Sequence, residues 1–154
     1  MDPDMIEVLE NCDIFSGLDD KQIKKIANIC HMETFETGEN LLSQGDFGEN
    51  LYIIAEGHVL LERSVDMGHR KANVAISMLG KRRALGCWST LLGEGHNLNT
   101  SATCRKPTKA VVVKGQVLRE IMIADVQLGF KTLERLCFIL RDRIQGIYGA
   151  MENI

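Results

Sequence analysis

The sequence predicts a mainly β fold, an antiparallel β-roll of the jelly-roll type with helices at both ends. Short runs of β-branched and aromatic residues, separated by glycines, fill the middle of the chain, and apolar residues spaced three or four apart flank them on both sides. The length of 154 residues is typical of one domain. We therefore expect a single domain over residues 1–154, with N-terminal helices at 5–31, the β-roll at 32–114 and C-terminal helices at 115–154.

Two short helices are expected before the roll, over residues 5–9 and 18–30. In the second, Leu18, Ile23 and Ile26 fall on one face and lysines on the other. Asp19 directly follows Leu18, and aspartate suits the first turn of a helix. The pattern therefore predicts an amphipathic helix that packs on the roll.

The central part of the chain reads as a series of short strands. Glu56-Gly57 and Met67-Gly68 are typical of hairpin tips. The runs that we expect to be strands are 32–36, 40–43, 51–54, 58–64, 72–78, 102–104 and 110–113. Antiparallel pairing of strands this short gives a roll or sandwich.

Helical spacing returns after Gly115, first in a short helix that ends near residue 125 and then in a longer one. The longer helix carries an apolar stripe, which consists of Leu133, either Leu136 or Cys137, Leu140, Ile144, Ile147 and Met151. This stripe can pack on the roll or against a second chain. A homodimer through Leu133, Leu140, Ile144 and Ile147 is therefore one expectation.

Composition excludes several classes of function. A formal net charge of −3 argues against nucleic acid or an anionic membrane as the main partner. No apolar run approaches the roughly 18–20 residues of a spanning helix, and the N-terminus has no signal-like apolar core. Known catalytic motifs are absent, so we expect no enzyme. The five cysteines are scattered without a CxxC pair, which indicates a reducing compartment, the cytoplasm, and no metal site.

Residues 79–103 form the one long stretch that is neither plain strand nor plain helix. Gly86 stands where a strand could give way to a turn of helix, and Ser89 and Thr90 would begin that turn. Unpaired amides at a helix start favour anions. The cluster Lys81-Arg82-Arg83 lies just upstream. The stretch is thus a surface crossover or an anion site.

Residues 35–59 carry a specific motif. It contains Phe35, Gly38-Glu39, Gln44-Gly45-Asp46, Gly48, Leu51-Tyr52, Gly57 and Val59. In order and spacing it resembles the signature of the cyclic nucleotide-binding domain family, and Ile14-Phe15 with Leu18 is similar to the family's entry into its N-terminal helices. The resemblance covers residues 5–145 and implies a small-ligand-sensing regulatory domain, with cAMP or cGMP as the candidate ligand and no resident cofactor.

The ligand cassette of the family is matched only in part. Leu85-Gly86 and Ser89 agree with it, but Cys87 and Thr100 stand where the family has the glutamate that holds the ribose and the arginine that neutralises the phosphate. Trp88-Ser89 is similar to the dipeptide that a bacterial subclass of the family carries at this place in its cassette. The resemblance implies ligand contacts from Gly86, Cys87, Trp88, Ser89, Thr100 and Ser101, possible phosphate contacts from Arg82 and Arg83, and Tyr52 with helix 133–144 as the responding surface.

Two other functions remain open on the same fold. Loss of both charged residues favours a ligand-free module that dimerises or binds another protein through its last helix. A sensor of a non-nucleotide effector such as haem or an organic acid is the other alternative, although His31, His58, His69 and His96 are isolated in the sequence. A DNA-binding domain of the appended kind is not expected, because few residues follow the last helix.

Overall fold

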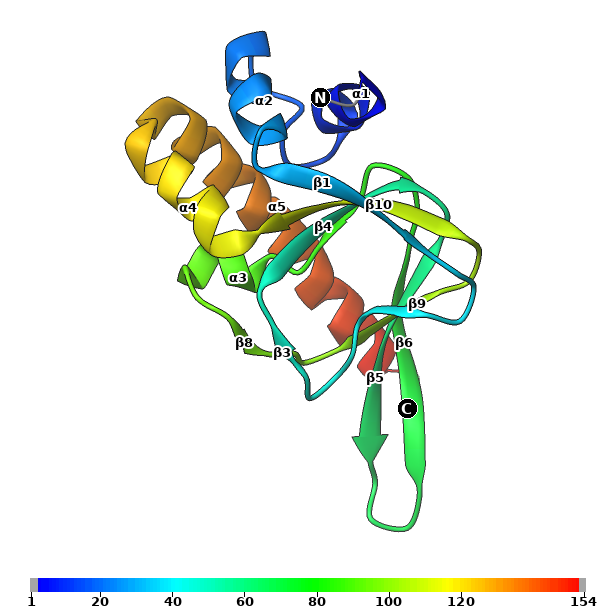
Figure 1. Cartoon of the computed structure of the whole chain (residues 1–154). Coiled ribbons are helices and arrows are strands. Elements are labelled where there is room, and N and C mark those ends of the chain that lie inside the picture. The colour runs from blue at the N-terminus through cyan, green and yellow to red at the C-terminus, as the bar shows by residue number, and fades with distance from the viewer. Residues whose placement is uncertain (1–2, 153–154) are drawn as a thin grey trace.

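The computed structural model describes residues 3–152, which form helices around a β-roll (Figure 1). The helices are α1 (Pro3–Asn11), α2 (Asp20–Ala27), α3 (Trp88–Leu92), α4 (Gly115–Ala124) and α5 (Val126–Met151). The strands are β1 (Cys30–Phe35), β2 (Asn40–Leu42), β3 (Phe47–Gly48), β4 (Asn50–Glu56), β5 (Val59–Asp66), β6 (Lys71–Leu79), β7 (Ala84–Leu85), β8 (His96–Asn97), β9 (Ser101–Cys104) and β10 (Thr108–Lys114).

The roll consists of two four-stranded sheets, in the orders β1-β10-β4-β7 and β2-β9-β5-β6, with β3 and β8 paired separately. All of these pairings are antiparallel. The predicted fold class is confirmed: antiparallel sheets are flanked by helices at the N-terminal end and by a long C-terminal helix.

The central strands of the first sheet, β4 and β10, are buried on both faces. Along β4, Leu51 and Ile53 point into one apolar cluster, while Tyr52 and Ile54 point into another. The first cluster lies under the helices and the second lies between the two sheets. Because successive side chains of a strand point to opposite faces, a sheet covered on both sides requires nearly continuous apolar runs. That requirement explains the sequence of β4 and of β10.

The second helix is shorter than the sequence predicted. Asp19 caps α2: its side chain accepts from the backbone amide of Gln22, and the Gln22 side chain accepts from the Asp19 amide. Leu18 therefore precedes the helix. The expected extension to Cys30 was wrong, because Cys30 begins β1 and pairs with Val113. Leu18 and Cys30 still pack on the apolar cluster under the helices, which is why the sequence showed them as part of the apolar stripe of the helix.

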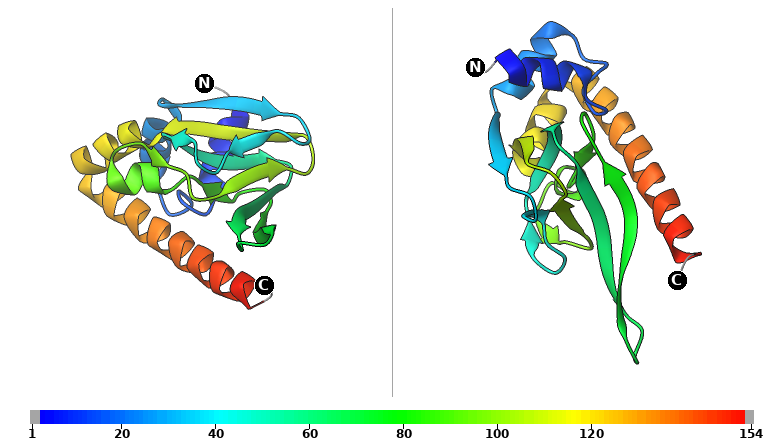
Figure 2. Two further views of the ribbon diagram at one scale, coloured as in Figure 1. Left: turned by 90° about the horizontal axis from the view of Figure 1, so that it is seen from below. Right: turned by 90° about the vertical axis from the view of Figure 1, so that its right-hand side faces the viewer.

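The hairpin predicted at Glu56-Gly57 was wrong, because this turn leads from β4 in one sheet to β5 in the other and the two strands do not pair. The predicted hairpin at Met67-Gly68 is confirmed and is longer than expected. It joins β5 to β6 and extends beyond the body of the roll (Figure 1). At its tip the Met67 amide donates to the Arg70 carbonyl at 2.8 Å, and the Gly68 amide donates to Asp66 Oδ1 at 2.9 Å. Helix α5 runs along β6 of this hairpin (Figure 2).

Helix α5 starts earlier than its apolar stripe indicated. Asp125 caps it, accepting from the Leu128 amide at 3.2 Å. Its first half is held by Leu128, Leu136 and Ile139, which are buried in the helix-side cluster. No helix within residues 3–152 combines the length and the apolar character that crossing a membrane requires.

Gly129 brings α4 and α5 together, and its substitution tests their packing. A Cβ at this position would lie 3.1 Å from the Met122 Cα and would also meet the Met122 carbonyl, whereas a Cβ at Gly149 on the same helix meets nothing within 4 Å. We expect Gly129→Ala to lower the free energy of unfolding by about 1–3 kcal/mol. Gly149→Ala should raise it by about 0.5–1 kcal/mol, since alanine favours helix. Chemical denaturation measures both, and equal signs would contradict the packing described here.

Candidate ligand site

The segment around Gly86 makes the turn that the sequence predicted. Strand β7 pairs with β4, Gly86 takes a φ of 82°, and α3 starts two residues later. A Cβ on Gly86 would collide with the Asn50 carbonyl oxygen. Glycine is therefore required both by the left-handed backbone and by the close approach to β4. The turn is therefore fixed against β4 of the first sheet.

A cavity of about 230 Å³ lies between the roll, this turn and α5, and we call it the roll cavity. Its wall is mainly apolar. The residues that line it are Leu42, Leu61, Ile76, Leu85, Gly86, Cys87, Trp88, His96, Leu98, Asn99, Thr100, Leu140, Arg143, Ile144 and Ile147. Apolar pockets with a few polar groups are the usual form of small-molecule sites.

Four of the six predicted ligand contacts line the roll cavity: Gly86, Cys87, Trp88 and Thr100. The other two serve the loops around it. Ser89 is 1% exposed and its hydroxyl donates to the Gly86 carbonyl at 3.0 Å. Ser101 accepts from the Gln44 amide at 2.9 Å through its hydroxyl oxygen. Neither serine lies on the cavity wall.

The basic residues that the sequence offered as phosphate contacts lie elsewhere. Arg83 Nε is 3.6 Å from Asp13 Oδ2, and Arg82 lines a different cavity. Arg82 has a φ of 78°, and its backbone is held at both ends, with its amide donating to Ile54 and its carbonyl accepting from Asp13. Neither Arg82 nor Arg83 lines the roll cavity.

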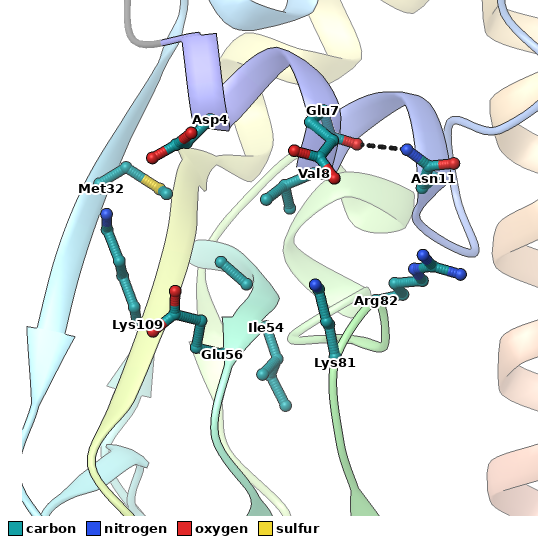
Figure 3. A pocket seen from close by; sticks show the side chains of 11 residues that line it. Asp4, Glu7, Val8, Asn11, Met32, Ile54, Glu56, Lys81, Arg82 and Lys109 are labelled. Atoms are coloured by element: carbon teal, nitrogen blue, oxygen red, sulfur yellow. Dashed lines mark hydrogen bonds between the residues drawn. The ribbon is translucent and has the colours of Figure 1, made fainter.

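The second cavity, of about 160 Å³, lies between α1 and the roll (Figure 3). Acidic and basic side chains face it in equal number. The acidic residues are Asp4, Glu7 and Glu56, and the basic residues are Lys81, Arg82 and Lys109. Opposite charges that compensate each other leave no net field for an ion. We therefore regard the roll cavity as the better ligand site.

Cys87 and Thr100 provide no charge in the roll cavity. Burial raises the pKa of the Cys87 thiol to about 12, so the sulfur stays protonated at neutral pH. A neutral thiol is a weak hydrogen-bond partner. The two positions at which the resemblance implies a carboxylate and a guanidinium are thus uncharged in this chain.

The cavity does hold a cation, which the sequence analysis missed. Arg143 of α5 lines it, and its Nη2 donates to the carbonyl of Ala84 in β7. Burial lowers the pKa of Arg143, but a guanidinium stays charged in proteins. The signal was present, because Arg143 follows Leu140 by three residues and precedes Ile147 by four, which places all three on one helical face.

His96 of β8 is the second polar group that was missed. It lines the roll cavity, and its Nδ1 is buried without a hydrogen-bond partner among the described residues. A buried polar atom without a partner costs free energy unless a ligand or water satisfies it. His96 was set aside in the sequence because no other ligand-type residue lies near it there.

Asp13 binds β7, the strand that Arg143 also contacts, through the backbone of Ala84. Its Oδ2 accepts from the Ala84 amide at 3.3 Å, so the amide of Ala84 is bound by Asp13 and its carbonyl by Arg143. Oδ1 of Asp13 is buried without a partner in the described part of the chain. Burial raises the pKa of this carboxyl, against the opposing effects of the Ala84 amide and Arg83.

A family profile described as the cyclic nucleotide-binding domain matches residues 32–125. Among solved structures, a cyclic nucleotide-binding domain from Methylobacillus flagellatus superposes with a TM-score of 0.77 at 20% identity, over 98% of this chain and 80% of that one. The regulatory subunit of a cAMP-independent protein kinase A from Trypanosoma brucei, as a mutant bound to cAMP in the A site, gives 0.64 at 25% identity, over 72% and 39%.

A curated relative is the type II regulatory subunit of cAMP-dependent protein kinase from Drosophila melanogaster. It is 31% identical over 80 residues, which are 52% of this chain and 20% of that protein. The chain thus spans a fifth or less of the length of the curated relatives that lead the comparison.

The opposite environments of Asp13 and Asp125 give a prediction about pH. The pKa of Asp13 is raised in the folded protein, so the fold binds this proton more tightly than the unfolded chain does. As the pH falls from 7 towards 4, the unfolding free energy of the wild type should therefore rise relative to that of Asp13→Asn. This increase in the unfolding free energy ends below pH 3.8, the ordinary pKa of an aspartate side chain.

Asp125 is the matched control. The Leu128 amide and Lys25 lower its pKa, so its contribution is present above 3.8 and is lost as the pH falls below that value. Relative to Asp125→Asn, the wild type should lose stability in acid. Denaturant titrations from pH 7 to pH 3 measure both differences. Parallel curves for Asp13→Asn and the wild type would show that Asp13 is not buried as described.

Proposed function

The chain belongs to the cyclic nucleotide-binding domain family, and we propose that its effector, cAMP or cGMP, binds in the roll cavity. The observation that supports this most directly is the coincidence of three features in one place. The cassette turn at Gly86, an apolar cavity and the long C-terminal helix all meet there. A regulatory domain needs such a meeting point between a ligand site and an element that can move.

Trp88 suits a ligand that carries a flat ring. Its side chain is 42% exposed although it lines the cavity, so part of the indole remains open for contact. Aromatic rings stack with offset geometry and contribute about 0.5–1.5 kcal/mol beyond the area that they bury. The base of a nucleotide has the shape that such a wall accepts.

Helix α5 is the element that we propose to respond. Its second half reaches the roll through Leu140, Arg143, Ile144 and Ile147, all of which line the cavity. A ligand among these side chains would change the contact between α5 and β6. The first half, fixed by Leu128 and Leu136 in the core, would keep its place. Tyr52, which the sequence grouped with the responding surface, lies instead in the cluster between the sheets.

The uncharged cassette sets the expected strength of binding. A hydrogen bond to a charged group contributes about 1.5–3 kcal/mol, so replacing the family's arginine by Thr100 should weaken phosphate binding by roughly ten- to a hundredfold. The neutral thiol of Cys87 adds to this loss on the ribose side. We therefore propose weak nucleotide binding.

A second candidate function, dimerisation through α5, rests on its outer face. Large apolar side chains are exposed there: Phe130 66%, Leu133 42% and Tyr148 64%. An exposed apolar face is typical of a helix that packs on another helix. Of the residues first expected at the dimer contact, Leu133 fits this face. Leu140 is partly buried in the core, and Leu140, Ile144 and Ile147 all line the cavity.

The remaining assignments follow from the family and the cysteines. The family is regulatory, and the described residues hold no group of three or more His, Cys, Asp or Glu placed to bind a metal ion. All five cysteines are free thiols. We propose a cytoplasmic location and no nucleic-acid partner, on the grounds of these thiols and of the net charge of −3.

Calorimetric titration with cAMP and cGMP tests the proposed ligand. Thr100→Arg, which supplies the missing guanidinium, should bind the better of the two about ten- to a hundredfold more tightly than the wild type. Asn97→Arg adds the same charge at an exposed position off the cavity and should leave the affinity unchanged. If neither the wild type nor Thr100→Arg gives a binding signal at millimolar nucleotide, the proposed function is wrong.

Light scattering on a size-exclusion column tests the dimer. We expect the wild type to elute as a dimer and Phe130→Asp with Tyr148→Asp as a monomer, because two buried carboxylates would oppose association. Leu92→Asp, at another exposed apolar site (52% exposed), is the control and should remain dimeric. A wild type that is monomeric at tens of micromolar would exclude this interface.

A further inference from the structure

The roll cavity has one formally charged residue on its wall, Arg143. The other polar groups there are His96, Asn99 and Thr100. A guanidinium against an apolar wall is poorly solvated and favours an anion of matching geometry. The charge balance of the cavity is therefore set by α5 and not by the cassette turn, although the turn is where the family motif lies.

The guanidinium of Arg143 is only partly engaged. Its recorded hydrogen bond within residues 3–152 is the one from Nη2 to the Ala84 carbonyl. No carboxylate of the described residues forms an ion pair with it, although Asp13 and Asp142 lie near enough to act on its charge, as does the opposing Arg83. An arginine carries five N–H donors. Most of them can thus serve a ligand.

We propose that Arg143 is the anion-binding residue of the roll cavity, and that it exchanges the Ala84 carbonyl for the anionic group of a ligand. The ligand class is an organic anion whose apolar or aromatic body fits the wall that Trp88 and the aliphatic side chains form. The proposal rests on the proposed function where that anion is the phosphate of cAMP or cGMP.

This exchange would make α5 the direct reporter of occupancy. Arg143 ties α5 to β7 through its hydrogen bond to the Ala84 carbonyl, and the Ala84 amide is bound on its other side by Asp13. A ligand anion that takes the guanidinium removes the tie to β7 and holds α5 through the ligand instead. Ala84 lies two residues before Gly86, so the cassette turn loses one of its supports at the same time.

His96 is the second observation that points to a ligand in this cavity. Its Nδ1 is buried there without a partner among the described residues, although a buried ring nitrogen normally has one. A ligand whose anion sits at Arg143 and whose body lies along the wall would bring a polar group within reach of His96. The cavity thus offers one charged and one neutral point of attachment.

The test compares Arg143→Gln with Arg141→Gln. Glutamine keeps an N–H donor for the Ala84 carbonyl but loses the charge, and Arg141 is an exposed arginine on the same helix that stacks on Phe138 and pairs with Asp142. Calorimetry with cAMP, cGMP and the uncharged nucleosides adenosine and guanosine gives the affinities. We expect Arg143→Gln to weaken cyclic nucleotide binding about ten- to a hundredfold and to leave nucleoside binding unchanged.

Arg143→Lys completes the series. It retains the charge without the planar fork and should recover part of the affinity. Arg141→Gln should behave as the wild type. Amide hydrogen exchange of residues 140–151 should change on nucleotide addition in the wild type and stay constant in Arg143→Gln. Binding that is equal in wild type and Arg143→Gln would overturn the assignment of Arg143 and leave the proposed function intact.

A second probe separates the two proposals if no nucleotide binds. Octanoate is an anion with an apolar body and carries no base or ribose. Thermal stabilisation of the wild type by millimolar octanoate, absent in Arg143→Gln and present in Arg141→Gln, would support the role of Arg143 without cyclic nucleotides. No stabilisation of the wild type by octanoate, together with silence towards nucleotides, would overturn it.

Discussion

The double-sided burial of β10 and β4, the central strands of the sheet β1-β10-β4-β7, is the constraint on which the rest of the structure depends. Side chains of β4 and β10 alternate between a cluster under the helices and a cluster between the sheets. Each face therefore needs its own cover, helices on one side and the second sheet on the other. The roll cavity lies beside this double core, where α5 leaves the helix-side cluster and continues along β6 (Figure 2).

The same sheet fixes the ligand cassette in space. Gly86 approaches the Asn50 carbonyl so closely that no side chain fits between them, and β7 pairs with β4 through Leu85 and Tyr52. The location of the proposed site thus follows from backbone geometry. Its chemistry follows from side chains that the backbone does not dictate, which is how the turn can keep its shape while Cys87 and Thr100 carry no charge.

How much the sequence could predict depended on whether the signal was local. Glycines at turns and alternating apolar runs are local, so the roll, the hairpin at Met67-Gly68 and the turn at Gly86 were predicted correctly. The hairpin expected at Glu56-Gly57 was not, because the strands on either side of it pair in different sheets, which is a long-range property. The start of β1 at Cys30 was not, because pairing with Val113 is a long-range contact that overrode a helix-like pattern. Arg82 and Arg83 were offered as phosphate contacts because they precede the cassette. They line no part of the roll cavity, because Arg82 faces the cavity beside α1 and Arg83 lies near Asp13, and these are long-range contacts that the local sequence does not reveal.

Arg143 was missed for a different reason, which also bears on how the domain works. A charged residue on a long helix is usually solvated, yet this one falls on the same face as Leu140 and Ile147 and so turns inwards. The opposite face of α5 carries Phe130 and Tyr148, which are exposed. One helix therefore forms the wall of the cavity on one side and an apolar surface on the other. A ligand that shifts the backbone of α5 would therefore move both, because the side chains of a helix share one backbone, and it would alter the surface offered to a second chain.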